Sequence, residues 1–295
     1  MNMSLIYALR PTQWTKNTLV LAAFFFAFGD QGQARGLGLS ELLISVCGMA
    51  LFCVVSSAVY LFNDLHDLAQ DRNHPRKRYR PIASGRVSTR TAIVTGVTLL
   101  VAGLGLSYAL QPSFGHVTAT YVLMQVLYTL ALKRVALLDT FIIAIGFVMR
   151  ALGGAVIIKV SISPWLLLCT FLLALFLGLC KRRHEKIELE DAGVASRESL
   201  SQYDQLLLDQ LIAIVSAATI VSYAIYTLWP DTVEKFGTYR LGFTIPLVIF
   251  GIFRYLDLVY RHEKGDRPEK ILLTDAPLLI CIALYGAAVV LIFSL

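Results

Sequence analysis

Long apolar stretches separated by short polar segments run through most of this chain. A helix must contain about 20 residues to cross the hydrocarbon core of a bilayer. Nine stretches are long enough, at residues 17–34, 40–62, 92–110, 114–132, 136–157, 164–180, 207–229, 240–259 and 274–294. The first is the weakest, because Gly29, Asp30 and Gly32 shorten it. The pattern predicts an all-α, polytopic membrane bundle of nine transmembrane helices, and because no linker or repeat divides the chain we expect one domain over residues 1–295.

Composition indicates that lipid is the solvent of this chain. Hydrophobic residues make up 57% of its 295 residues and charged residues only 16%, whereas soluble proteins carry roughly 25% charged residues. Together with a mean hydropathy of +0.67, these values exclude a soluble globular protein and a disordered one. Arg10, Pro11 and Lys16 interrupt the apolar segment that a cleavable signal peptide would need. We therefore expect the first hydrophobic run to remain in the mature protein.

The basic residues are distributed unevenly between the two sides of the predicted bundle. Twenty Lys and Arg residues lie in the N-terminal tail and in alternate loops, against four in the opposite loops. Cytoplasmic loops of membrane proteins are enriched in Lys and Arg, so the asymmetry predicts a cytoplasmic N-terminus. It also accounts for the net charge of +6 without a nucleic-acid partner. The five cysteines form no CxxC or Cys/His cluster, so we expect buried thiols and neither a disulfide framework nor a zinc site.

Three aspartates follow the second apolar stretch. Asp64, Asp67 and Asp71 are spaced i, i+3, i+7, so a continuing helix would place all three on one face. Like charges at that spacing repel one another, and a hard divalent cation such as Mg²⁺, which is often shared with substrate phosphates, removes the penalty. A solvated acidic helix end is the alternative, but carboxylates at the edge of a membrane bundle favour a functional site.

A basic segment comes directly after the aspartates and includes Arg76, Lys77, Arg78, Arg80 and Arg86. Acidic residues followed by basic ones are the layout expected for a metal-bound diphosphate. The carboxylates hold the ion, and the guanidinium and ammonium groups bind the remaining phosphate oxygens. The same residues also suit a topology signal in contact with anionic lipid, and both interpretations can hold together.

Residues 63–71 read Asn-Asp-x-x-Asp-x-x-x-Asp, and Arg-Pro-Ile-Ala-Ser-Gly follows at residues 80–85. This combination resembles the first aspartate-rich motif of the UbiA superfamily of polytopic prenyltransferases, which also have nine transmembrane helices. The resemblance therefore extends over essentially the whole chain. It implies a Mg²⁺ cofactor held by Asp64, Asp67 and Asp71 and a diphosphate substrate. With the asymmetry of the basic loops, we expect a bacterial inner (plasma) membrane location with the active site facing the cytoplasm.

Two further segments resemble one branch of that superfamily. Residues 10–17, Arg-Pro-Thr-Gln-Trp-Thr-Lys-Asn, are similar to the opening motif of decaprenyl-phosphate phosphoribosyltransferases. Residues 181–188 depart from the second Asp-x-x-x-Asp motif of aromatic prenyltransferases, because three basic residues precede Glu185 and Glu188. Basic groups suit a substrate with an additional phosphate, since Arg binds phosphate bidentately. The pattern therefore favours phosphoribosyl pyrophosphate.

The resemblance predicts Mg²⁺-dependent transfer of 5-phosphoribose from phosphoribosyl pyrophosphate to a polyprenyl phosphate, releasing pyrophosphate and making a lipid-linked pentose precursor for cell-envelope glycan. Prenylation of an aromatic acceptor remains open as the alternative. An ion-coupled transporter is a weaker alternative, because transporter sites lie at mid-depth in the membrane and the charges here cluster on one side. The expected partners are these two substrates and membrane lipid, with no nucleic acid, and homo-oligomerisation is left open.

The residues assigned to these roles come from several segments. The predicted catalytic residues are Asp64, Asp67, Asp71 and Lys16, and the predicted substrate-binding residues are Asn17, Asn63, Arg72, Lys77, Arg78, Arg80, Tyr128, Lys133, Arg150, Lys181, Arg182 and Glu185. Asp139 and Arg150 lie eleven residues apart on one predicted helix, about 16 Å of rise, and therefore cannot pair directly. Whether Asp139 belongs to the site or to internal hydrogen bonding stays open.

Overall fold

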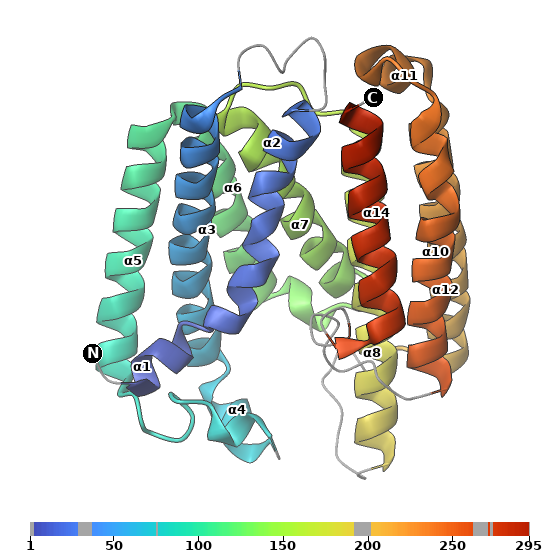
Figure 1. Ribbon diagram of the computed structural model, residues 1–295. Coiled ribbons are helices and arrows are strands. Elements are labelled where there is room, and N and C mark those ends of the chain that lie inside the picture. The colour runs from blue at the N-terminus through green and yellow to red at the C-terminus, as the bar shows by residue number, and fades with distance from the viewer. Residues whose placement is uncertain are drawn as a thin grey trace. The chain divides into compact units, whose positions relative to one another are not determined.

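The computed structural model describes residues 3–28, 37–74, 76–191, 202–261, 271 and 274–294, and within these ranges the regular structure is helical throughout (Figure 1). The chain divides into two compact units. Unit 1 comprises Met1–Ala27, Gly36–Leu132 and Gly146–Ile162, and unit 2 comprises Phe28–Arg35, Lys133–Ile145 and Ser163–Leu295. Each unit is described separately below, and the single domain expected from the sequence stays a prediction.

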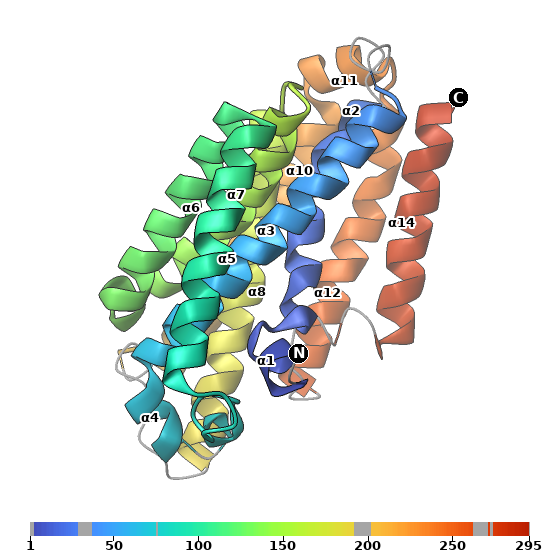
Figure 2. The same ribbon diagram turned by 90° about the vertical axis from the view of Figure 1, so that its left-hand side faces the viewer.

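In unit 1, α3 packs against both α5 and α6, and α5 packs against α6 (Figures 1 and 2). The elements are α1 (Met3–Ala8), the 3-10 helix η1 (Pro11–Thr18), α2 (Leu19–Phe28), α3 (Leu39–His66), α4 (Leu68–Asn73), η3 (Lys77–Tyr79), α5 (Thr89–Leu110), α6 (Pro112–Leu130) and the second part of α7 (Leu138–Ile157). In the core, the ring of Phe52 packs edge-on against Phe114 and Tyr121, each at 5.6 Å between centroids. Gly154 lets α7 approach α2, because a Cβ there would lie 1.9 Å from the Val20 carbonyl oxygen.

The boundary between α5 and α6 follows from the local sequence. The Ser88 hydroxyl accepts a hydrogen bond from the Thr91 amide at 3.1 Å and so caps the start of α5. Gln111 is extended between the two helices, and Pro112 is the first residue of α6. A backbone N–H at that position has no acceptor within the helix, so the proline costs no hydrogen bond. The two helices can therefore fold back on each other through a one-residue connection.

In unit 2, α8 packs along α10, α10 along α12, and α12 along α14 (Figure 1). The elements are the first part of α7, α8 (Pro164–Asp191), α10 (Gln205–Leu228), α11 (Pro230–Phe236), η5 (Arg240–Thr244), α12 (Ile245–Arg261) and α14 (Ala276–Ser294), while η4 (Leu132–Arg134) belongs partly to each unit. The ring of Phe176 packs edge-on against Tyr255, at 5.4 Å between centroids. Aromatic contacts of this kind join helices that are distant in sequence.

Seven helices in the described part of the chain are long and apolar enough to cross a membrane. They are Leu39–His66, Thr89–Leu110, Leu138–Ile157, Pro164–Glu188, Gln205–Leu228, Arg240–Arg261 and Ala276–Phe293. The predicted all-α, multi-pass membrane class is confirmed. The predicted stretches 17–34 and 114–132 are not among the seven: only part of the first is described, and polar residues such as His116 and Gln125 lower the hydropathy of α6. The count of nine spans and the cytoplasmic N-terminus stay predictions.

Candidate active site

The acidic motif lies at the end of α3, and the helix does not continue unbroken through it as the spacing suggested. α3 ends at His66, Asp67 has φ −89° and ψ 5°, and α4 begins at Leu68. The Asp67 amide still donates to the Asn63 carbonyl at 3.0 Å, and the Asp71 amide donates to the Asp67 carbonyl at 2.9 Å. The chain therefore keeps a helical hydrogen-bond spacing while it changes direction at Asp67.

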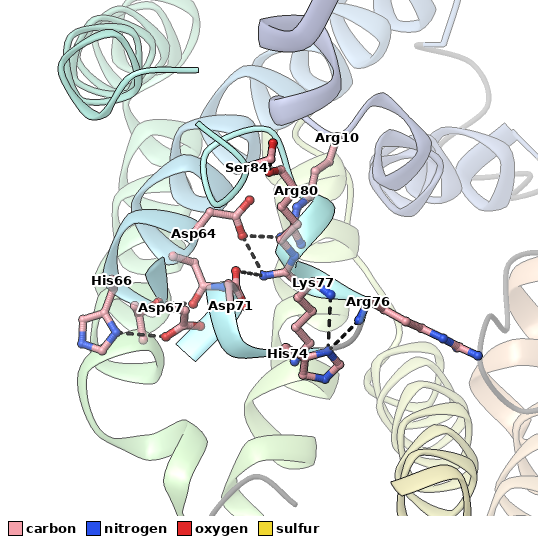
Figure 3. Close-up of polar contacts among 12 residues, drawn as sticks. Arg10, Asp64, His66, Asp67, Asp71, His74, Arg76, Lys77, Arg80 and Ser84 are labelled. Atoms are coloured by element: carbon pink, nitrogen blue, oxygen red, sulfur yellow. Dashed lines mark hydrogen bonds and ion pairs between the residues drawn. The ribbon is translucent and has the colours of Figure 1, made fainter. Parts of the chain in front are cut away.

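Asp64 and Asp71 converge on one arginine. Their side chains are only 2% and 4% exposed. Nη1 of Arg80 donates to Oδ1 of Asp64 at 3.0 Å and to Oδ2 of Asp71 at 2.7 Å (Figure 3). Because a single nitrogen contacts both carboxylates, the side chains of these two predicted metal ligands lie close to each other.

Asp67 faces a different neighbour. Its Oδ1 lies 3.1 Å from Nδ1 of His66, on the side away from Arg80 (Figure 3). Over the described ranges, no three His, Cys, Asp or Glu side chains gather closely enough to hold a metal ion. Asp64 and Asp71 fit a hard divalent cation by donor type, because Mg²⁺ prefers carboxylate oxygens. The joint coordination by all three aspartates stays a prediction, and Pro75 lies outside the described residues.

Arg10 also joins this cluster, although it was not among the predicted site residues. It forms an ion pair with Asp64, and its Cζ lies 5.0 Å from the centre of the Tyr60 ring. Its backbone is left-handed, with φ 55° and ψ 59°, which is uncommon for a residue other than glycine and disfavoured before a proline such as Pro11. The signal available in the sequence was its position at the start of the segment that also contains Lys16.

The other basic residues near the motif differ in exposure. Arg72 and Arg78 are exposed, whereas Lys16 and Lys77 are partly buried. The guanidinium of Arg78 packs against the ring of its neighbour Tyr79. Arg80 directly contacts the two buried carboxylates, while Arg72 and Arg78 lie at the surface of unit 1.

Two predicted site residues that are far apart in sequence meet inside unit 1. Nε of Arg150 donates to Oδ1 of Asn17 at 2.7 Å, and Nη2 donates to the Tyr121 hydroxyl at 2.9 Å. Asn17 and Arg150 are 1% and 4% exposed. Asn63, another predicted site residue, accepts a hydrogen bond from the Thr129 hydroxyl at 3.4 Å.

Unit 2 contains a separate buried cluster around Asp139. Nε of Arg182 donates to Oδ2 of Asp139 at 2.7 Å, and Nη1 of Arg182 pairs with Glu185. The Tyr203 hydroxyl donates to Oδ1 of Asp139 at 2.9 Å. Burial raises the pKa of Tyr203 to about 12, and the negative charge of Asp139 also raises it. The phenol is therefore protonated at neutral pH and remains a donor to the carboxylate.

This arrangement bears on the predicted phosphate-binding residues of α8. Two nitrogens of Arg182 already contact carboxylates, so its proposed role with phosphate stays a prediction that must compete with these contacts. Lys181 is more exposed, and its Nζ lies 3.9 Å from Oε1 of Glu185. Lys133 is buried and Tyr128 is partly exposed. The sequence left open whether Asp139 belongs to the site or to internal hydrogen bonding. In the structure it is fully buried and forms an ion pair with Arg182.

Comparison with known proteins places these clusters in context. The model of the UbiA prenyltransferase family matches residues 18–274. A decaprenyl-phosphate phosphoribosyltransferase of Mycobacterium tuberculosis is 35% identical over 288 residues, which cover 96% of this chain and 93% of the relative. Its counterpart in Mycolicibacterium smegmatis is 34% identical over 295 residues, covering 97% and 92%. A UbiA homologue from Archaeoglobus fulgidus bound to GPP and Mg²⁺ has the same fold, with a TM-score of 0.72 at 20% identity over 99% of this chain and 100% of that one.

Proposed function

This chain belongs to the UbiA prenyltransferase family, and on that premise we propose that it transfers 5-phosphoribose from phosphoribosyl pyrophosphate to a polyprenyl phosphate. The convergence of Asp64 and Asp71 on one guanidinium nitrogen carries the diphosphate part of the proposal. The choice of reaction within the family is supported by the near-full-length similarity to proteins named decaprenyl-phosphate phosphoribosyltransferase. Family membership also argues against the transporter considered from the sequence.

In the proposed reaction the ribose C1–oxygen bond to the diphosphate breaks, and a bond forms between C1 and an oxygen of the polyprenyl phosphate. When bound by Asp64 and Asp71, with Asp67 as the predicted third ligand, Mg²⁺ would neutralise charge on the departing pyrophosphate. The acceptor phosphate is already anionic near neutral pH, so the reaction needs little help from a general base. This fits a site made of carboxylates and cations.

The chain's own cations have defined tasks in this proposal. Arg10 and Arg80 lie directly beside the two carboxylates and bind oxygens of the diphosphate, because a guanidinium matches phosphate geometry. Lys16 and Lys77, both partly buried, add positive charge from the neighbouring segments. The further predicted substrate contacts in unit 1 are Asn17, Asn63, Arg72, Arg78, Tyr128 and Arg150. The substrate-binding roles of Lys133, Lys181, Arg182 and Glu185 in unit 2 remain separate predictions.

The proposal includes a location. The excess of Lys and Arg in alternate loops supports chemistry on the cytoplasmic side of the bacterial inner membrane. The product, a polyprenyl-phosphoryl 5-phosphoribose, would be a lipid-linked pentose precursor for cell-envelope glycan. It would stay in the membrane because its polyprenyl chain remains attached.

A label-transfer experiment tests the proposal. Purified protein is incubated with Mg²⁺, a polyprenyl phosphate and phosphoribosyl pyrophosphate labelled in the ribose, and the lipid is then extracted. We expect label in the lipid fraction only when protein, Mg²⁺ and polyprenyl phosphate are all present. A parallel reaction uses a polyprenyl diphosphate and an aromatic acid. Product in that reaction, with no ribose label in lipid, would establish the alternative prenyltransferase activity instead.

A further inference from the structure

Arg150 is a buried cation whose partners are all uncharged. Its Nε donates to Asn17, its Nη1 donates to the Gly146 carbonyl at 2.6 Å, and its Nη2 donates to Tyr121. Its Cζ also lies 4.9 Å from the centre of the Tyr121 ring and 5.6 Å from that of Phe147. Among the residues that the structure describes, no carboxylate pairs with this guanidinium.

The charge of Arg150 is therefore not balanced within the described part of unit 1. Arginine keeps its proton in proteins, so the group cannot become neutral to reduce the cost of burial. Buried charges are normally paired, and charged residues inside membrane bundles commonly mark a functional site. Arg182 in unit 2 illustrates the usual solution, because it is similarly buried and contacts both Asp139 and Glu185.

The guanidinium of Arg150 still has hydrogen-bonding capacity. Arginine carries five N–H groups, and the three contacts above leave one on each terminal nitrogen without a described partner. Asn17 is held in turn, because its Nδ2 donates to Sγ of Cys53 and to Oγ of Ser56, each at 3.2 Å. These contacts fix the orientation of the guanidinium before any ligand arrives, which is the property required of an anion site.

We propose that the two remaining N–H groups of Arg150 bind the phosphate monoester of a substrate. This inference rests on the proposed function, in which each substrate carries a phosphate monoester apart from the diphosphate that leaves. Those groups are the 5-phosphate of the donor and the phosphate of the polyprenyl acceptor. A doubly charged phosphate would supply the counter-charge that Arg150 lacks in the described chain.

The subsite is distinct from the Asp64–Asp71 pair. Asn17, which holds Arg150, contacts α3 at Cys53 and Ser56, and Asp64 lies eleven and eight residues further along the same helix. At 1.5 Å of rise per residue, Asp64 lies roughly 12–17 Å along the α3 axis from the residues that contact Asn17. That is longer than one diphosphate group, so the two places hold different phosphates.

Binding measurements on the purified protein test the subsite without relying on turnover. The parent and Arg150→Gln are titrated with ribose 5-phosphate, with a short prenyl monophosphate, and with pyrophosphate plus Mg²⁺. We expect the affinity for one of the two monoesters to fall about 10–150-fold in Arg150→Gln, while pyrophosphate with Mg²⁺ binds as it does to the parent. The monoester that is weakened identifies the source of the phosphate.

Two additional variants keep the test decisive. Arg150→Lys retains the charge but loses the planar fork, so it should bind the same monoester more weakly than the parent even if Arg150→Gln does not fold. Arg254→Gln is the matched control, because Arg254 lies in a candidate span but already pairs with Asp257 and Asp275, and its monoester affinities should equal those of the parent.

Two results would overturn the subsite in distinguishable ways. If the parent transfers ribose to lipid and both Arg150 variants bind the two monoesters with parental affinity, the subsite is wrong and the proposed function survives. If the parent binds neither monoester and transfers no label, the proposed function and the subsite fall together.

Discussion

Arg182 and Asp139 form a buried ion pair, with Nε of Arg182 donating to Oδ2 of Asp139 at 2.7 Å. Their side chains are 9% and 0% exposed, and they come from α8 and α7 of unit 2. Tyr203, which precedes α10, donates to the other carboxylate oxygen. One aspartate therefore ties together three separate segments of the chain, which gives this pair a structural task whatever its part in substrate binding.

Removing one partner of this pair should destabilise the protein strongly. Arg182→Gln leaves the buried carboxylate of Asp139 without this positively charged partner, and Asp139→Asn removes the buried negative charge beside Arg182. We therefore expect each variant to lose about 3–5 kcal/mol in the free energy of unfolding. The double variant Arg182→Met with Asp139→Leu should recover much of that loss, because no buried charge remains. Thermal unfolding of the purified proteins measures this, and single variants as stable as the parent would contradict the structural role.

Arg182→Lys separates the structural role from the predicted phosphate-binding role. If Arg182 binds the 5-phosphate, loss of its planar fork should raise the Michaelis constant for phosphoribosyl pyrophosphate about tenfold or more. If it acts solely as the partner of Asp139, stability should fall while that constant remains close to the parental value. Steady-state kinetics on folded protein distinguish these results.

Replacing Asp64 or Asp71 with Asn should lower activity by a factor on the order of a hundred or more. The change preserves size but removes the charge needed to hold Mg²⁺. Glu41→Gln provides a control, because Glu41 lies in the first turn of α3 at the other end of the helix, and it should leave turnover unchanged. The measurement is label transfer to lipid over a Mg²⁺ titration.

Asp67→Asn tests the predicted third metal ligand. Because Asp67 faces His66 in this structure, joint coordination requires its carboxylate to turn toward the other two. We expect activity to fall and the Mg²⁺ concentration required for half-maximal rate to rise. An active Asp67→Asn protein with a parental Mg²⁺ titration would remove Asp67 from the metal site and leave Asp64 and Asp71 as its protein ligands.

Arg10→Gln should reduce kcat/KM by about 10–150-fold, because it removes a charged donor from the proposed diphosphate site. Arg90→Gln is the matched control, since Arg90 is an exposed arginine on α5 of the same unit. Equal kinetics for Arg10→Gln and Arg90→Gln would show that Arg10 sets only the position of the N-terminal segment against α3.

Single cysteines at Ser84 and Tyr239 should be labelled from opposite sides of the membrane. Ser84 follows the acidic motif, and Tyr239 lies between α11 and η5; both are exposed. In a cysteine-free background, an impermeant thiol reagent applied to right-side-out vesicles should label the cysteine at position 239 and spare the one at position 84. Labelling of both from one side would refute the orientation inferred from the basic loops.

The sequence alone was sufficient for the membrane class, the family resemblance and the location of the acidic motif. Each of these depends on properties that are local along the chain. Hydropathy accumulates over about 20 consecutive residues, and the motif at residues 63–71 is a matter of spacing. The resemblance implied the UbiA fold, and the fold and family comparisons confirm it. The three aspartates were identified as one cluster because helical spacing predicts neighbours within a single helix.

Only the tertiary structure determines which charged and polar residues contact one another across the fold. Arg10 reaches Asp64 across 54 positions, and Arg150 reaches Asn17 across 133. Spacing cannot predict such pairs, because contacts between helices depend on how their faces pack and not on rise along one axis. Asp67 shows the same limit at short range: one non-helical residue between α3 and α4 directs its carboxylate toward His66, while Asp64 and Asp71 still share Arg80.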